Sequence, residues 1–340
     1  MQAHGTLTET PRDVPDARFA LPSTIHWMRA LAILAADQNL DFAAGRTFYA
    51  KVQARSVPDR ELNTVCEQLL FILNQIAALQ ALTSAPNKAD VARTAIVAWY
   101  YGVYSAASAM TAAMDGSFQD NHAETARKWQ ERFPAKNLAM HPFADCLSNV
   151  VPTTVDTELA PVRAKGRHSL VNEPTTAQEA WGCCAEYLSG TAGWERWNVE
   201  ERVRETPAFK ALGVSDFRTK GARELRDAAY ARRGIAFLHQ ASRYRGKANY
   251  RDAIFLAYGN SVPRQLSSFI DDLLVALKAF AAMAGAYCSL RVGKVAWTEF
   301  VDDLDRKKGH LGFAKRRLVM GRRRHSCQRS LAATIADHLP

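Results

Sequence analysis

Apolar residues recur in steps of three and four along three long segments of this 340-residue chain. Side chains at that spacing share one face of an α-helix, whereas strict alternation of apolar and polar residues indicates a strand. The recurring positions are Leu62, Val65, Leu69, Ile72, Ile76 and Leu79; Ile96, Tyr100, Val103, Ala107, Met110 and Met114; and Leu266, Ile270, Leu273, Leu277, Phe280, Ala284 and Tyr287. The pattern predicts amphipathic helices over 60–82, 92–114 and 264–288.

Weaker patterns of the same kind predict the remaining secondary structure. They indicate further helices over 24–38, 122–133, 175–190, 220–240, 247–258 and 295–308. Clusters of turn-forming residues predict loops at 83–90, 115–121, 134–143, 148–174 and 191–215. No alternating run flanked by turn residues predicts a strand. We therefore expect an all-α fold, a helical bundle with shallow crossing angles.

Three features bear on the cellular location of the chain. Residues 1–23 are polar and lack a basic start followed by an apolar stretch, so we expect a flexible N-terminal arm and no secretory signal. The apolar segment 273–290 has Lys278 at its centre, which favours a buried helix over a membrane span. The six cysteines form no CxxC pair, as is typical of reduced thiols. We expect a cytoplasmic protein with no membrane partner.

Charge is distributed unevenly along the chain. Residues 1–200 carry 17 Lys and Arg against 21 Asp and Glu, a net charge of −4, whereas residues 201–340 carry 27 against 13, a net charge of +14. A basic half of this kind favours a polyanionic partner, with nucleic acid first and an acidic protein next. We expect a helical domain over 24–198 and a basic helical domain over 199–340, which includes the Arg- and Lys-rich segment 306–329.

The segment AWYYGVYSAASAM at 98–110 combines large aromatic side chains with very small ones. Tyr100 and Tyr104 lie one turn apart on a helix, and Ala106, Ala107 and Ala109 follow. Small residues let a second helix approach closely, while the rings fill the space beside it. A buried tyrosine also needs a polar partner for its hydroxyl group. This face is expected to pack in the core and to border a polar loop or groove.

The same helix resembles the second helix of HEPN domains, small helical bundles named for nucleotide binding in higher eukaryotes and prokaryotes. The resemblance rests on Ala95, Tyr100, Tyr101, Tyr104, Ala106, Ala107 and Ala109, and it extends over residues 60–190. The loop and helix at 243–288 resemble a second, degenerate copy. The resemblance implies a homodimer, or a subunit of a larger defence complex, that binds RNA. Many such proteins are metal-independent endoribonucleases of toxin–antitoxin or anti-phage defence systems.

The resemblance also implies a catalytic pair, because HEPN ribonucleases carry an arginine and, four to six residues later, a histidine near the start of the last helix. A neutral histidine can take the proton of a ribose 2′-hydroxyl, and an arginine can stabilise charge on the phosphate. Arg163 and His168 have this spacing in the loop before the expected last helix, and Arg232 or Arg233 with His239 offers a second pair. Position favours Arg163 and His168. Ala164 departs from the polar residue usual in the family, and a non-catalytic descendant with His168 as a surface residue is the alternative.

The basic residues of the second half are the candidate nucleic-acid contacts. Arg243, Arg245, Lys247 and Arg251 alternate with Tyr244 and Tyr250, and the segment 306–325 contains Arg316, Arg317, Arg322, Arg323 and Arg324. Arginines beside aromatic rings suit phosphate contacts together with base stacking, which favours single-stranded RNA over DNA. A solvated basic helix and a core-facing tyrosine are the structural alternatives.

Other chemistries lack their motifs in this sequence. There is no GxxxxGK[ST] phosphate loop, no GxSxG, no HExxH and no carboxylate cluster with metal-binding spacing. We therefore expect neither a metal nor a cofactor. The sequence leaves two functions open: a HEPN-like RNA-binding protein that cleaves RNA, or a non-catalytic helical adaptor whose basic half docks on nucleic acid or an acidic partner protein.

Overall fold

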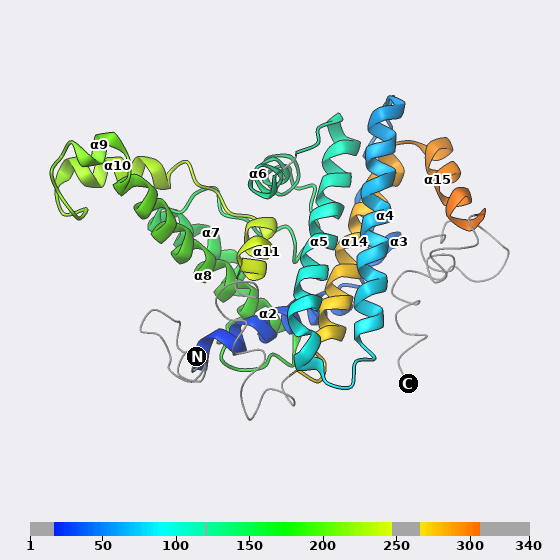
Figure 1. The fold of residues 1–340 in the computed structure, drawn as a ribbon, viewed down its shortest axis with the longest axis horizontal. Coiled ribbons are helices and arrows are strands. Elements are labelled where there is room, and N and C mark those ends of the chain that lie inside the picture. The colour runs from blue at the N-terminus through cyan, green and yellow to red at the C-terminus, as the bar shows by residue number, and fades with distance from the viewer. Residues whose placement is uncertain (1–16, 120, 247–265, 307–340) are drawn as a thin grey trace, which may run out of the picture.

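The computed structural model describes residues 17–119, 121–246 and 266–306, and these residues form an all-α fold (Figure 1). Within these ranges there is no β-strand, and one isolated antiparallel bridge joins Leu147 to Ile235. The helices, with one 3-10 turn, η1, are α2 (Ala17–Asp37), α3 (Phe42–Phe48), α4 (Asp59–Leu82), α5 (Lys88–Asp115), α6 (His122–Arg132), η1 (Pro134–Lys136), α7 (Pro152–Lys165), α8 (Ala177–Arg204), α9 (Pro207–Lys210), α10 (Lys220–Tyr230), α11 (Phe237–Gly246), α14 (Phe269–Arg291) and α15 (Lys294–Arg306). The expected fold class is confirmed.

The three helices predicted from the strongest periodicity form the centre of the molecule. α4 and α5 pack together as an antiparallel pair, and α14 packs against α5, α2, α3 and α4. The small residues of α5 allow this close approach, since Ala106, Ala107 and Ala109 are fully buried. We call α2–α6, α11 and α14 the main bundle.

A second hydrophobic cluster lies beside the main bundle. It is built by α7, the C-terminal half of α8, α9 and α10, which we call the lateral lobe and which extends to the left in Figure 1. α8 runs through both parts without a break, and the expected domain boundary at 198/199 falls inside it. The border between the two hydrophobic clusters therefore differs from the expected boundary at 198/199, which follows the change in net charge along the sequence.

Two expected loops contain helices. The prediction of a loop over 148–174 is wrong, because α7 occupies Pro152–Lys165. Pro152 stands in the first turn of this helix, where proline is tolerated, and Val155 and Leu159 are buried against α8. The loop expected at 191–215 is wrong as well, since α8 continues to Arg204. In both cases tertiary burial of one helix face outweighs the local preference of Pro and Gly for turns.

The remaining boundaries differ by less. The helix expected over 220–240 is divided into α10 and α11, because the backbone of Ile235 hydrogen-bonds to that of Leu147 at N–O distances of 2.7 and 2.9 Å. α2 begins at Ala17, inside the expected N-terminal arm 1–23. The helix expected over 247–258 lies outside the described residues.

Two described helices, α4 and α14, are long and apolar enough to cross a membrane by length and composition. α14 is the more deeply buried of the two, with 83% of its most apolar window buried inside the molecule. Its burial against four other helices confirms the expectation that the apolar segment 273–290 forms a core helix and explains its composition without a membrane.

Candidate functional site

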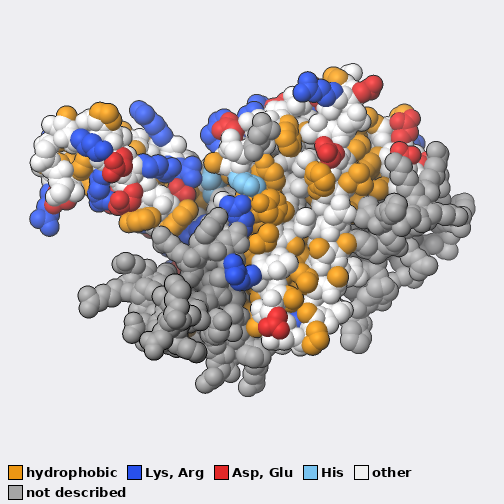
Figure 2. Space-filling model, in the orientation of Figure 1, with side chains coloured by type: hydrophobic (Ala, Val, Ile, Leu, Met, Phe, Trp, Pro, Cys, Tyr) orange, Lys and Arg blue, Asp and Glu red, His pale blue; other side chains and the backbone are white. Residues whose placement is uncertain are grey.

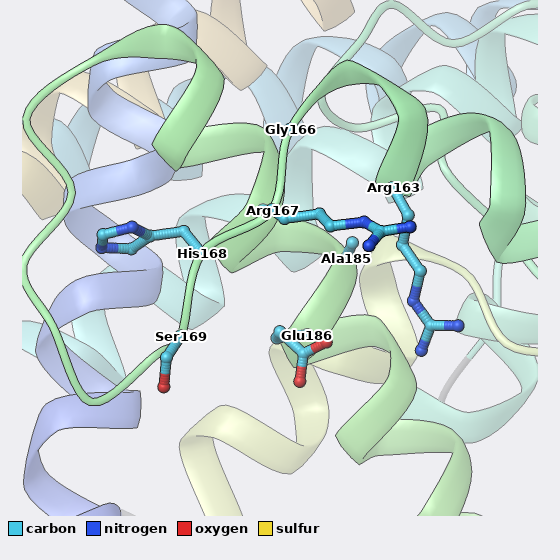
Figure 3. A pocket seen from close by; sticks show the side chains of 8 residues that line it. Arg163, Gly166, Arg167, His168, Ser169, Ala185 and Glu186 are labelled. Atoms are coloured by element: carbon cyan, nitrogen blue, oxygen red, sulfur yellow. The ribbon is translucent and has the colours of Figure 1, made fainter.

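The two residues of the favoured Arg–His pair line one cavity. This cavity, of about 650 Å3, lies where α7 ends and the following loop passes over α8 (Figure 3). It is lined by Arg163, Gly166, Arg167, His168, Ser169, Gly182, Ala185 and Glu186. The cavity therefore combines two guanidinium groups with one carboxylate.

Two glycines allow the loop to lie directly on α8. A Cβ atom on Gly166 would be 1.8 Å from the carbonyl oxygen of Gln178, and a Cβ atom on Gly182 would be 2.2 Å from the backbone nitrogen of His168. The helix beneath begins with a capping box, in which the Thr176 side chain accepts from the backbone N–H of Glu179 and the Glu179 carboxylate binds back. Close backbone contact and a capped helix therefore fix the course of residues 166–168.

The side chains of Arg163 and His168 point to different sides of this loop. The His168 ring is turned toward α2, away from Arg163 (Figure 3). Its Nδ1 atom lies 3.9 Å from Oε1 of Glu179, a carboxylate whose pKa is lowered to about 2 by hydrogen bonds from Thr175. Arg163 instead donates to the Ser189 hydroxyl at 3.4 Å. The structure brings the two residues to one cavity without aiming them at a common point.

The second Arg–His pair is held in structural contacts. Arg233 forms two hydrogen bonds to the buried carboxylate of Glu195, at 2.9 and 3.0 Å. His239 is buried, and its Nδ1 atom accepts a hydrogen bond from the backbone N–H of Ala236 at 3.1 Å, which caps α11. Burial lowers the pKa of His239 to about 3, so the ring is neutral over the ordinary pH range.

Because His239 stays neutral in the folded protein, we expect it to weaken the protein in acid. The unfolded chain binds a proton below about pH 6.5, whereas folded His239 does so only near pH 3. Its stabilising contribution is therefore complete above pH 6.5 and is lost as the pH falls toward 3. Urea unfolding of the wild type and of His239→Gln measures the difference between their free energies of unfolding. We expect this difference to shrink by about 1.4 kcal/mol per pH unit between about pH 6 and 4. A difference that does not change with pH would contradict a neutral buried ring.

Most basic residues of the lateral lobe have acidic partners. The pairs, at N–O distances of 2.5–3.9 Å, are Arg202–Glu195, Arg204–Glu200, Arg204–Glu201, Lys210–Glu205, Arg218–Asp216, Lys220–Glu224 and Arg226–Asp227. These ion pairs offset part of the positive charge of the lateral lobe locally.

Arg243 and Arg245 on α11 lie on aromatic rings instead. The guanidinium carbon of Arg243 is 5.5 Å from the ring centre of Tyr187 and 5.9 Å from that of Trp194, while the guanidinium carbon of Arg245 is 4.7 Å from the ring centre of Tyr100. Neither forms an ion pair with a carboxylate of the described residues. Figure 2 shows basic, histidine and hydrophobic side chains next to one another over α6 and α11. The expected contacts Lys247, Arg251, Arg316, Arg317, Arg322, Arg323 and Arg324 lie outside the described residues.

The tyrosine that alternates with these arginines does not share their surface. Tyr244 is fully buried, and its hydroxyl group donates to the carbonyl oxygen of Thr24 at 3.1 Å. Successive side chains on a helix point in different directions, so Tyr244 packs in the core while its neighbours Arg243 and Arg245 remain partly exposed. The rings beside the arginines come from α5 and α8.

The sequence did not indicate a further histidine, His122, at the start of α6. Its ring centre lies 5.3 Å from that of Tyr100, 5.8 Å from that of Tyr101 and 4.4 Å from that of Tyr104. Tyr104 donates to the carbonyl oxygen of Gln119 at 3.0 Å, which confirms that the tyrosine face borders a polar loop. That expectation was the only sequence signal pointing to this place, since no motif connects His122 to the residues around it.

No family model matches the chain, and the comparisons with curated proteins and with solved structures found no match either. In the described part of the chain, no group of three or more His, Cys, Asp or Glu side chains is placed to hold a metal ion. The HEPN resemblance therefore rests on the sequence pattern alone.

Proposed function

We propose that this chain is a HEPN-like protein that binds single-stranded RNA on the face formed by α5, α8 and α11. The observation that carries the proposal is the position of Arg243 and Arg245, which lie on aromatic rings and not on carboxylates. A guanidinium group held over a ring keeps N–H donors free for phosphate oxygens. Trp194 and Tyr101, exposed by 36% and 41%, offer ring faces on which bases can stack.

The HEPN resemblance extends the proposal beyond binding. It adds a metal-independent endoribonuclease of a toxin–antitoxin or anti-phage defence system, acting as a homodimer or within a defence complex. The competing function is an adaptor that docks on an acidic partner. The exposed ring of Trp194, which lies beside Arg243, and the exposed ring of Trp197, about one turn further along α8, favour it as the second candidate. Both functions use the same face of α8, so they differ in the ligand.

Binding of a fluorescently labelled single-stranded RNA tests the proposal. We expect Arg243→Ala/Arg245→Ala to weaken binding at least about tenfold and to reduce the slope of log K against log salt by about 1.4, or about 0.7 for each lost phosphate contact. Arg218→Ala/Lys220→Ala removes the same charge from two ion-paired side chains, exposed by 91% and 87%. We expect this control to bind as the wild type does.

Two outcomes would contradict RNA binding at this face. Equal weakening by both double variants would mean that net charge alone attracts the RNA. Absence of RNA binding by the wild type, together with binding of an acidic peptide that depends on Arg243, would favour the adaptor.

A further inference from the structure

His122 and Arg245 meet at one tyrosine ring although 123 positions separate them in sequence. The guanidinium carbon of Arg245 is 4.7 Å from the ring centre of Tyr100, and the His122 ring centre is 5.3 Å from the same point. The three groups belong to three different helices, α11, α6 and α5, which pack against one another. Tertiary structure thus creates an Arg–His pair that has no counterpart in the spacing of the sequence.

The tyrosines around this pair are already supplied with hydrogen-bond partners. The hydroxyl group of Tyr104 bonds to Gln119 and to Thr125, and that of Tyr100 bonds to Ser242. In contrast, Nδ1 of His122 and Nε of Arg245 are buried atoms without a partner in the described residues. Most buried polar atoms in proteins are hydrogen-bonded, so two exceptions at one place are unusual. Both atoms are too deeply buried for a ligand to reach, so a ligand at this place would bind the other nitrogens of the same two side chains.

The electrostatics keep His122 in the form that a general base requires. Burial, and then the positive charge of Arg245, lower the pKa of His122 below its ordinary value. The ring is therefore neutral at neutral pH and can accept a proton. Its Nδ1 atom is buried, so Nε2 of the partly exposed ring is the nitrogen that remains for a substrate. The neighbouring ring of Tyr101 is 41% exposed and can stack on a base.

We propose that His122 and Arg245 form a site that cleaves single-stranded RNA, with His122 as the general base and Arg245 as the group that stabilises the phosphate. The inference rests on the proposed function, because it requires RNA to bind this face. His122 takes the proton of a ribose 2′-hydroxyl, and the 2′ oxygen bonds to the adjacent phosphorus atom. The bond from phosphorus to the 5′ oxygen breaks, and that oxygen takes a proton from water. The products are a 2′,3′-cyclic phosphate and a 5′-hydroxyl group, and His122 returns its proton to solvent.

This site differs from the pair favoured by sequence spacing. His168 is turned away from Arg163, whereas His122 and Arg245 adjoin the same ring. Arg245 also lies close enough to His122 to lower its pKa by its charge. Geometry therefore favours the pair assembled by three helices over the pair adjacent in the chain.

Cleavage of a mixed-sequence single-stranded RNA by the full chain, in buffer containing a metal chelator, tests the site. We expect wild-type protein to yield fragments with 2′,3′-cyclic phosphate ends, and His122→Ala to lose at least about a hundredfold in rate, the usual contribution of a general base. RNA affinity should stay within about twofold of the wild type, and added imidazole should restore part of the rate. His141→Ala removes an exposed histidine outside both sites and should cleave as the wild type does.

Several controls separate the failure of this site from the failure of RNA binding. His122→Gln keeps the size of the side chain, so a variant that melts as the wild type does but cannot cleave RNA excludes misfolding as the cause. RNA with 2′-O-methyl ribose should bind without being cut. Wild-type protein that binds RNA but cuts none would overturn the site and leave the binding proposal standing. Loss of cleavage in His168→Ala, with His122→Ala unaffected, would overturn it in favour of the Arg163 and His168 pair.

Discussion

Trp27→Ala should destabilise the protein by about 3–5 kcal/mol, the usual cost of removing a large buried ring, and lower the melting temperature by roughly 10 °C. The Trp27 side chain is 1% exposed and stacks on Tyr187 at a ring-centre distance of 3.9 Å. Its edges contact Trp99 and Tyr244. One side chain therefore joins α2, α5, α8 and α11, and its removal leaves a cavity that several rigid rings cannot close. Thermal melting followed by circular dichroism measures the effect.

Trp197→Ala is the matched control for this substitution. Trp197 lies on α8 and is 49% exposed, so its truncation leaves no closed cavity. We expect a change in stability within about 0.5 kcal/mol, as for most surface substitutions. If both tryptophan variants melted alike, Trp27 would not join the four helices as described.

Gly182→Ala should destabilise the protein by about 2 kcal/mol, although alanine favours a helix more than glycine does. The added Cβ atom would stand 2.2 Å from the backbone nitrogen of His168 and 2.6 Å from the carbonyl carbon of Arg167. Backbone atoms cannot turn aside as a flexible side chain can, so the loop must move away from α8. The displacement would also open the cavity lined by Arg163 and Arg167. Chemical unfolding in urea measures the loss.

The same substitution elsewhere on α8 should have the opposite effect. A Cβ atom on Gly190 would meet only the guanidinium group of Arg243, at 3.6 Å. Gly190→Ala should therefore stabilise the protein by about 0.5–1 kcal/mol through helix propensity. A loss of stability equal to that of Gly182→Ala would mean that contact with the loop does not set the cost.

Periodicity predicted the helices that bury one continuous face. α4, α5 and α14 match the segments 60–82, 92–114 and 264–288 closely, because their apolar stripes pack against one another. Where turn residues interrupt a helix, the same reasoning failed. Pro161 lies within α7, and Gly190 and Gly193 lie within α8, on sides that face solvent or that have space around the backbone. The free energy that each proline or glycine costs the helix is smaller than the free energy gained when the opposite face of that helix is buried.

The candidate site was less accessible to sequence reasoning than the fold. Arg163 and His168 are close in the chain, but spacing along a chain does not fix the direction of a side chain, and the structure turns them apart. His122 and Arg245 carry no common pattern, because the packing of α6 and α11 against α5 brings them together. Only the tyrosine face of α5, with its need for polar partners, pointed to the place where they meet.

The continuity of α8 has a mechanical consequence for the molecule. Tyr187 belongs to the core of the main bundle, and Leu188, the next residue, belongs to the cluster of the lateral lobe. Gly190 and Gly193 follow within two turns, so the least helix-favouring part of α8 lies where the two clusters adjoin. Leu188 and Ala192 flank Gly190 and both belong to the cluster of the lateral lobe, so a bend of α8 at Gly190 would deform that cluster. The unbroken helix, held on both sides of its glycines, therefore acts as one rigid support that ties the lateral lobe to the face that carries Arg243.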